Sequence, residues 1–198
     1  MIKTVISFNA NQLISMSKQI SNRYKPDIYT IHKFVYSLFP KELNAKFSFN
    51  KELIKNGKQH IIIQSDKRPI IPSFIDADQI KSYVYDDDFF ENKEFNFVID
   101  INSSKRLASN GKYSPVKPDE IIDWITLKFE KNNLHISSVN LISQSMEMFY
   151  AKNNNKVTIY HSKLIGRVKT SDKESIKNAM INGIGRGKTY GYGMLILN

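Results

Sequence analysis

The sequence contains no cysteine, and this absence excludes several kinds of site. Disulfide bonds, thiolate metal sites and cysteine nucleophiles all need the missing side chain. Histidine is also scarce, and the four histidines show no spacing typical of metal ligands. They are His32, His60, His135 and His161. We therefore expect neither a metal centre nor a bound cofactor.

Long apolar runs are missing as well. No run approaches the roughly 20 residues that a membrane-spanning helix needs. The apolar stretch at residues 1–8 is short and interrupted, unlike a cleavable secretory signal. A content of 41% hydrophobic and 24% charged residues is typical of a folded globular chain. These features predict a soluble, cytoplasmic protein with no membrane partner.

Acidic residues are too few to balance the basic ones. The chain has 19 Asp and Glu against 29 Lys and Arg, a net charge of +10. Between Asp76 and Asp100 the balance is reversed, with eight acids and two lysines, and subtracting this −6 from +10 leaves +16 for the remainder. A polyanion, most commonly nucleic acid, is the partner that such a charge favours. A basic protein without such a partner remains an alternative.

Glycine is infrequent, yet five of the eight glycines fall within eleven residues. We call residues 182–198, NGIGRGKTYGYGMLILN, the glycine-rich segment. Its glycines alternate with cations and phenols, and an apolar run that resembles a strand follows. Glycine lets the backbone approach a ligand closely, and the interleaved side chains suit an anionic, aromatic partner such as RNA. The five glycines are Gly183, Gly185, Gly187, Gly191 and Gly193.

Two other interpretations of the glycine-rich segment have to be compared with this one. A nucleotide-binding P-loop would need a glycine at position 182, which is Asn182, and a helix after Thr189, where only nine residues remain. The dinucleotide-binding pattern G-x-G-x-x-G is not matched either. A glycine-rich turn that only ends a helix remains open.

Hydrophobic periodicity predicts alternating strands and helices. We expect a helix within residues 27–39, capped by Asp27, and a helix opened by Pro118. A third helix, 172–181, would begin with a capping box of Ser171 and Glu174 and end at Asn182 and Gly183. A short helix is expected within 9–25, and a loop with a short helix in 76–94. Strands are predicted at 2–8, 47–50, 60–65, 95–101, 134–141, 145–151, 157–161 and 163–169 and at the end of the glycine-rich segment. The strands 47–50 and 60–65 would lie on either side of a turn at Asn56 and Gly57.

This order fits an α+β fold of two β-α-β-β-α-β units in tandem. We place the N-terminal domain at residues 1–131 and the C-terminal domain at 132–198. Lys152 and Lys156 would then flank the tip of a polar hairpin in the C-terminal domain.

Four segments resemble one family, in the same order over nearly the whole chain. They are YTIHKFVYSLFP at 29–40, FVIDINSSKR at 97–106, the helix around DWI at 123–125, and GRVKTSDKESIKNAMINGIGRGKTYGYGMLIL at 166–197. The chain resembles the CRISPR-associated repeat-processing endoribonucleases, in particular the type I-E branch that stays in the Cascade complex. It departs from the family pattern at Ser103, Lys173, Tyr190 and Tyr192, and none of these changes removes a group that the chemistry needs.

The resemblance implies two ferredoxin-like domains and one cut at the 3′ base of a CRISPR-repeat stem-loop, without a metal. The RNA's own 2′-hydroxyl would attack the scissile phosphate and leave a 2′,3′-cyclic phosphate. The product would be retained among other Cascade subunits. The Y-x-x-H match places the family's active tyrosine and histidine at Tyr29 and His32.

His32 can act as a base or an acid because its side chain titrates near neutral pH. Tyr29 is a weak base but a good donor, and Lys33 could stabilise the developing charge. Which of the two residues gives or takes a proton is left open, as is a packing role for Tyr29. The residues expected to contact RNA are Lys33, Lys105, Arg106, Lys112, Lys152, Lys156, Gly183, Gly185, Arg186, Gly187 and Lys188. A non-catalytic RNA-binding Cascade subunit and a general RNA-binding module are the competing functions.

Overall fold

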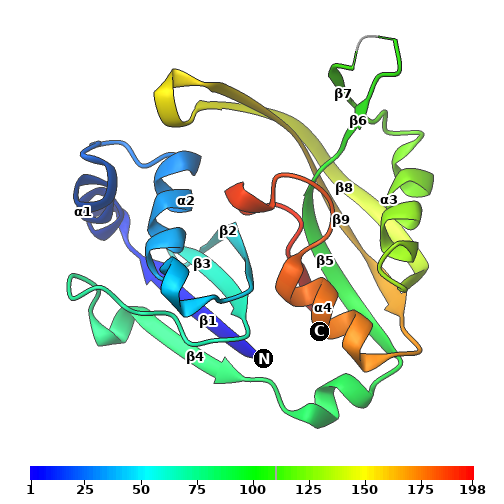
Figure 1. Cartoon of the computed structure of the whole chain (residues 1–198), viewed down its shortest axis with the longest axis horizontal. Coiled ribbons are helices and arrows are strands. Elements are labelled where there is room, and N and C mark those ends of the chain that lie inside the picture. Colours follow the sequence, from blue (N-terminus) through cyan, green and yellow to red (C-terminus); the bar gives the residue numbers. More distant parts are fainter. Residues whose placement is uncertain (110) are drawn as a thin grey trace. The chain divides into compact units, whose positions relative to one another are not determined.

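The computed structural model describes residues 1–109 and 111–198, and for 52–55 it describes only the backbone. It divides the chain into two units, Met1–Tyr85 with Thr189–Gly191, and Asp86–Lys188 with Tyr192–Asn198. Each unit combines helices with a four-stranded sheet, so the predicted α+β class is confirmed (Figure 1). None of the helices in the described ranges is long and apolar enough to cross a membrane.

The sheet of the first unit is antiparallel throughout. Its strands are β1 (Ile2–Phe8), β2 (Phe47–Lys55), β3 (Lys58–Ser65) and β4 (Ile80–Val84), in the order β2-β3-β1-β4. Asn56 and Gly57 form the turn between β2 and β3, as predicted, with φ of 53° and 70°. This strand order is the one expected for a ferredoxin-like unit.

The helices α1 (Ala10–Ser21) and α2 (Ile28–Ser37) form the first crossover of this unit. The Asp27 carboxylate accepts a hydrogen bond of 2.7 Å from the Thr30 amide, so the predicted cap of α2 is confirmed. One face of α2 is buried in the core with residues of β1 and β3, because its apolar side chains recur at helical spacing. The buried α2 residues of that core are Ile31, Phe34 and Val35.

The second crossover of the first unit contains no α-helix among its described residues. A 3-10 helix, Ala77–Gln79, precedes β4, and four of the five β4 residues are exposed. The sequence interpretation took residues 76–94 as a loop with a short helix and missed β4. An exposed edge strand lacks the apolar alternation by which strands are recognised.

The second unit has the complete β-α-β-β-α-β order. Its main strands are β5 (Glu94–Asn102), β8 (His135–Tyr150), β9 (Lys156–Lys169) and β10 (Leu195–Leu197), in the order β10-β5-β9-β8. Helix α3 (Ile121–Glu130) packs against β8, and α4 (Lys173–Asn182) packs against β10. A short hairpin of β6 (Ser104–Arg106) and β7 (Tyr113–Pro115) follows β5.

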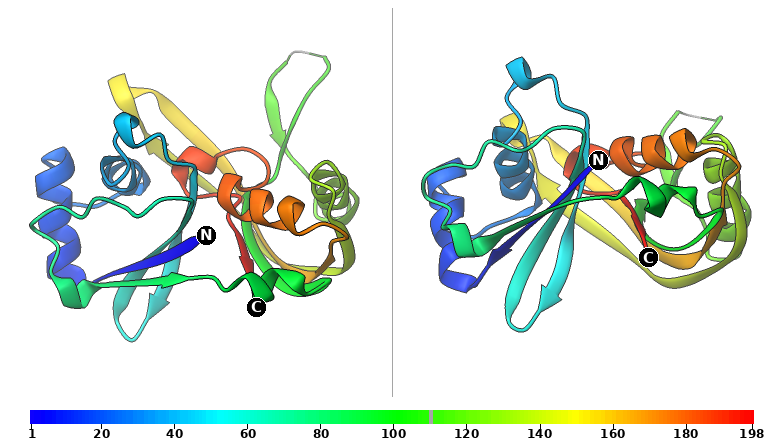
Figure 2. Two further views of the ribbon diagram at one scale, coloured as in Figure 1. Left: turned by 60° about the horizontal axis from the view of Figure 1, so that its bottom comes forward. Right: turned by 90° about the horizontal axis from the view of Figure 1, so that it is seen from below.

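Strands β8 and β9 form one long hairpin, visible in yellow and orange in Figures 1 and 2. The sequence predicted four shorter strands here. Register shifts between Ile136 and Ser138, and between Leu141 and Ser143, interrupt the alternating pattern without ending the strand. Strand β5 pairs with β9 only from His161 to Lys169, so the distal half of the hairpin extends beyond it.

The division between the units differs from the predicted boundary at residue 131. Strand β5 pairs with β9 and β10, and α3 packs against β8, so all of these elements belong to the second unit. The prediction had assigned β5 and α3 to the first domain because it expected a helix in each crossover. The first unit instead makes its second crossover with a loop and a 3-10 helix.

Two helix starts also differ from the predictions. Helix α3 begins at Ile121, three residues after Pro118, because residues 118–120 form a turn. The carboxylate of Asp172, and not Ser171, caps α4 by accepting hydrogen bonds from the amides of Glu174 and Ser175. Gly183 ends α4 with a φ of 67°, as expected.

Candidate active site and nucleic-acid interface

His32 lies on α2, on the face that turns away from the core. Three phenols surround its imidazole: the ring centroids of Tyr29, Tyr36 and Tyr190 lie 5.5, 4.4 and 5.5 Å from that of His32. Tyr29 lies three residues before His32 and Tyr36 four residues after it. The rings of Tyr29, His32 and Tyr36 therefore lie on one face of α2. Residues Thr189–Gly191, which include Tyr190, belong to this first unit.

The imidazole is held by a backbone carbonyl. Nδ1 of His32 lies 2.8 Å from the carbonyl oxygen of Thr189. A carbonyl oxygen can only accept a hydrogen bond, so Nδ1 must carry the proton. In the neutral imidazole, Nε2 is then the unprotonated nitrogen, with a lone pair that can accept a proton.

The pKa of His32 lies below the ordinary value of 6.5. Burial lowers it most, the hydrogen bond to Thr189 opposes this, and the charge of Lys33 lowers it further. A lowered pKa keeps the imidazole neutral at physiological pH, which is the form that can act as a base.

The phenol of Tyr190 stays protonated. Burial raises the pKa of Tyr190, and the neighbouring Tyr29 and Tyr36 raise it further. The guanidinium of Arg23 is ion-paired with Asp27 and lies 5.9 Å from the Tyr29 ring centroid. The protonated phenol of Tyr190 therefore provides a donor next to the unprotonated nitrogen of His32.

The predicted pair is therefore close together, and the structure adds two residues that sequence reasoning did not assign to the site. Tyr36 could have been found from its i+4 spacing to His32. Tyr190 was recognised only as part of the glycine-rich segment, and its approach to His32 spans more than 150 positions. No local spacing could have revealed that contact.

The glycines of the glycine-rich segment face the protein itself. A Cβ built on Gly193, where φ is 83°, would lie 2.1 Å from the Ile184 carbonyl oxygen, and one on Gly187 would lie 3.3 Å from the Cβ of Asn102. The amide of Gly193 donates to the Asp100 carbonyl at 2.6 Å. These glycines thus allow the segment to fold tightly against β5, and this explains their presence without a bound ligand.

Tyr192 also differs from the expectation that the phenols of this segment face a partner. Its side chain is buried, and its hydroxyl donates to the Glu147 carboxylate at 2.6 Å. The same carboxylate lies 3.6 Å from Nδ1 of His161, whose Nε2 is 2.7 Å from the carboxylate of Asp100. This network links β5, β8 and β9 to the glycine-rich segment, and no local pattern in the sequence predicts it because its members are distant along the chain.

All of the cations expected to bind RNA, except Lys33, lie in the second unit. The guanidinium of Arg186 stacks on the ring of Tyr113 in β7, 3.9 Å from the ring centroid, and donates to its hydroxyl. Lys105 on β6 is ion-paired with Glu120. Nε of Arg106 donates to the carbonyl of Gly111 at 3.1 Å. The other exposed members are Lys112 on the β6–β7 hairpin, Lys188, and Lys152 and Lys156 at the tip of the β8–β9 hairpin.

Lys33 is the remaining predicted cation, and it lies on α2 beside His32 in the first unit. Among the described residues, no group of three or more His, Asp and Glu side chains is arranged to hold a metal ion.

Comparison with known proteins identifies a matching family and several similar structures. A family described as CRISPR associated protein matches residues 6–198. The fold is similar to Thermus thermophilus Cse3 bound to an RNA representing a pre-cleavage complex, with a TM-score of 0.76, 16% identity and coverage of 100% of this chain and 98% of that chain. It is also similar to Cas6e from Escherichia coli K-12, with a TM-score of 0.68, 22% identity and coverage of 100% and 98%.

A chain of a CRISPR RNA-guided surveillance complex in its pre-nicking state is similar too, with a TM-score of 0.68, 16% identity and coverage of 100% and 99%. A comparison with curated proteins gave no match. At these identities the solved structures establish a shared fold, and the predicted pair of ferredoxin-like units is confirmed. Because the family match spans almost the whole sequence, this chain belongs to the CRISPR-associated protein family.

Proposed function

We propose that the protein is an endoribonuclease that cuts CRISPR precursor RNA once, at the 3′ base of the repeat stem-loop, by attack of the RNA's own 2′-hydroxyl. The observation that carries the proposal is the hydrogen bond from Nδ1 of His32 to Thr189, which leaves Nε2 to accept a proton. Membership of the CRISPR-associated family supports it, as does the fold shared with an RNA-bound Cse3.

In this reaction the 2′-hydroxyl loses a proton as its oxygen bonds to phosphorus, and the bond to the 5′-oxygen breaks. His32 takes the proton through Nε2, a contribution of roughly 10²- to 10⁴-fold. Tyr29, whose ring stacks against His32, donates a hydrogen bond to the phosphate or the leaving oxygen. Lys33, the next residue on α2, stabilises the negative charge of the transition state.

The proposed reaction needs no metal, because the nucleophile belongs to the RNA and the charge is met by protein cations. The leaving 5′-oxygen takes up a proton from water, so the products are a 2′,3′-cyclic phosphate and a 5′-hydroxyl. The scattered cations of the second unit suit the backbone of A-form RNA, which proteins recognise mainly through phosphates and shape. We also propose that the product stays bound and that the protein is a subunit of Cascade.

The test uses a CRISPR-repeat stem-loop, taken from a repeat array encoded beside the gene, incubated with the protein in EDTA. The wild type should make one cut and leave a cyclic phosphate, and His32→Ala should lose cutting while it keeps binding. His135→Ala is the matched control, because His135 is an exposed histidine on β8 of the second unit. Wild-type binding without any cutting would instead support a non-catalytic RNA-binding subunit.

A further inference from the structure

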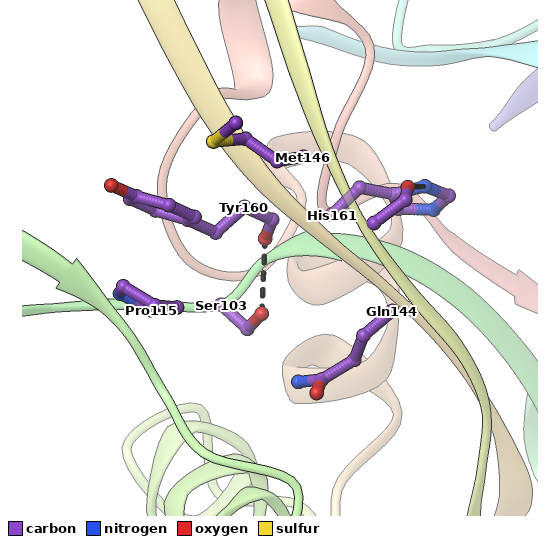
Figure 3. Close-up of a pocket in the computed structure, with 7 residues that line it drawn as sticks. Ser103, Pro115, Gln144, Met146, Tyr160 and His161 are labelled. Atoms are coloured by element: carbon purple, nitrogen blue, oxygen red, sulfur yellow. Dashed lines mark hydrogen bonds between the residues drawn. The ribbon is translucent and has the colours of Figure 1, made fainter.

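A cavity of about 300 Å³ lies beside the β8–β9 hairpin, within the second unit (Figure 3). Its size is at the lower end of the range for small-ligand sites, about 300–1,000 Å³. Of the described residues that line it, none belongs to the groups assigned above to cutting or to phosphate binding. The cavity is therefore a separate feature of this unit.

Two walls of the cavity are apolar. Met146 of β8 and Tyr160 of β9 are direct cross-strand partners, so their side chains share one face of the hairpin. Figure 3 shows them on that face, whereas the ring of His161, the next residue on β9 and also a lining residue of the cavity, is directed away from Tyr160. A phenol ring, an exposed thioether and the ring of Pro115 offer the contacts that a flat aromatic ligand prefers.

A fixed hydrogen-bond acceptor lies in the same cavity. The side-chain Nε2 of Gln144 donates to the carbonyl oxygen of Val116 at 3.3 Å and to Oγ of Ser162 at 3.0 Å. A carbonyl can only accept, so these contacts fix which end of the amide is nitrogen. Oε1 of Gln144 accepts no hydrogen bond from the residues that the structure describes, and so it is available to a donor on a ligand.

Ser103 holds the strand that carries the apolar wall of Tyr160. Its hydroxyl donates to the carbonyl oxygen of Tyr160 at 3.0 Å, as the dashed line in Figure 3 marks, and lies 2.6 Å from Oγ of Ser162. The side chain of Ser103 is buried. The backbone that carries the Tyr160 ring is therefore held in place, so the apolar wall is already formed before a ligand enters.

An exposed apolar strip leads away from the cavity. Met146, Met148 and Tyr150 alternate along β8 and are 57%, 54% and 56% exposed. Tyr150 pairs with Lys156, and Lys152 follows at the hairpin tip. Aromatic and thioether surfaces that end in two cations suit a single-stranded nucleic acid, whose bases stack while its phosphates meet the lysines.

We propose that this cavity binds one unpaired nucleobase of the repeat RNA, with the base against Tyr160 and Met146 and a donor on its edge directed to Oε1 of Gln144. The neighbouring nucleotides follow the strip toward Lys152 and Lys156. The identification of the RNA rests on the proposed function, whereas the site itself rests on the cavity. The fixed acceptor and the two lysines favour RNA over an apolar protein segment.

The first experiment replaces each unpaired nucleotide of the repeat RNA, one at a time, by an abasic residue. At one position the loss of the base should weaken wild-type binding roughly 5- to 150-fold, the range that one stacked base contributes. That loss should vanish in Tyr160→Ala and shrink in Gln144→Ala. Ile142→Ala is the matched control, because Ile142 is an exposed apolar residue of β8 that does not line the cavity, and it should keep the full sensitivity.

The second experiment needs no variant in the RNA-bound sample. The Met146 methyl group of the whole wild-type chain, assigned with Met146→Leu, should shift upfield in NMR spectra when the RNA binds, because a stacked base places it in a ring current. RNA that binds tightly without moving this signal, and without any coupled abasic position, would refute the nucleobase site and leave the proposed function intact. RNA that does not bind at all would refute both.

Discussion

Nδ1 of His32 donates a hydrogen bond of 2.8 Å to the carbonyl oxygen of Thr189, 157 positions further along the chain. This contact assigns the proton of the neutral imidazole to Nδ1 and leaves Nε2 as the basic nitrogen. The sequence left open whether His32 acts as acid or base, and this geometry favours the role of base that we propose for it. Because a main-chain atom is the acceptor, the preference depends on the backbone path of the glycine-rich segment.

That dependence can be tested at Gly191, where φ is 85° and a Cβ would lie 2.9 Å from the ring of Phe49. Gly191→Ala should displace the backbone next to Thr189 and lower the rate of RNA cutting at least tenfold, with little loss of RNA binding. Single-turnover cleavage under saturating protein measures this. Gly57→Ala is the matched control, because Gly57 also has a positive φ of 70° but has no described atom within 4 Å of its Cβ position. Equal rates in the two variants would contradict the role of Thr189.

The pH dependence of cutting should follow the lowered pKa of His32. A base works in its neutral form, so the rate should rise with pH through a midpoint below 6.5 and then level off. The charge of Lys33 lowers this pKa, so Lys33→Met should move the midpoint to higher pH. Rates at a series of pH values, with an NMR titration of the His32 ring, measure both. Lys41→Met, in the 3-10 helix that follows α2, is the control and should not move the midpoint.

Arg186, which stacks on Tyr113, should affect the affinity for RNA rather than the rate of cutting. Arg186→Ala removes a cation that Tyr113 already holds in place, so RNA binding should weaken and the slope of log affinity against log salt should fall by about one. Tyr113→Phe keeps the stacking surface and should have a smaller effect. Binding isotherms at several salt concentrations provide the measurement. Arg167→Ala on β9 is the control, and an identical slope in both arginine variants would remove Arg186 from the interface.

The buried hydrogen bond between His161 and Asp100 in the second unit should contribute to stability. His161→Ala removes the imidazole that lies 2.7 Å from the carboxylate of Asp100, which is 3% exposed, and losing such a buried hydrogen bond costs about 1–3 kcal/mol. The free energy of unfolding in urea would measure the loss. The double variant with Asp100→Ala should lose less than the sum of the single variants, because both single variants remove the same hydrogen bond. Strict additivity would show that the two groups act independently.

Local patterns predicted most of the regular elements. The cap at Asp27, the turn at Asn56 and Gly57 and the strand β5 follow from side-chain chemistry within a few residues, and all are confirmed. Local patterns did not predict the edge strand β4, nor that β8 and β9 are each one continuous strand. An exposed edge carries little apolar alternation, and a bulge disrupts the alternation of a strand that in fact continues.

The candidate site likewise contains residues that a local motif predicted and residues that only the structure revealed. Tyr29 and His32 were identified from a local motif, and their catalytic role stays a prediction. Tyr190, Thr189 and the network around His161 depend on pairings between distant segments, which a single sequence does not encode in any local pattern. The domain boundary was misplaced for a related reason, because only the strand pairing of β5 reveals which unit it joins.

The hydrogen bond between His32 and the carbonyl of Thr189 also has a consequence for protein synthesis. The ribosome makes the helix that carries His32 long before it reaches residue 189, so in the nascent chain the imidazole lacks this acceptor until Thr189 has been made. A chain that stops anywhere before Thr189 would have the imidazole that we propose as the base without the contact that fixes its tautomer. Cutting activity would then report that translation has passed this point, and no fragment of the first 188 residues should cut RNA at the full rate.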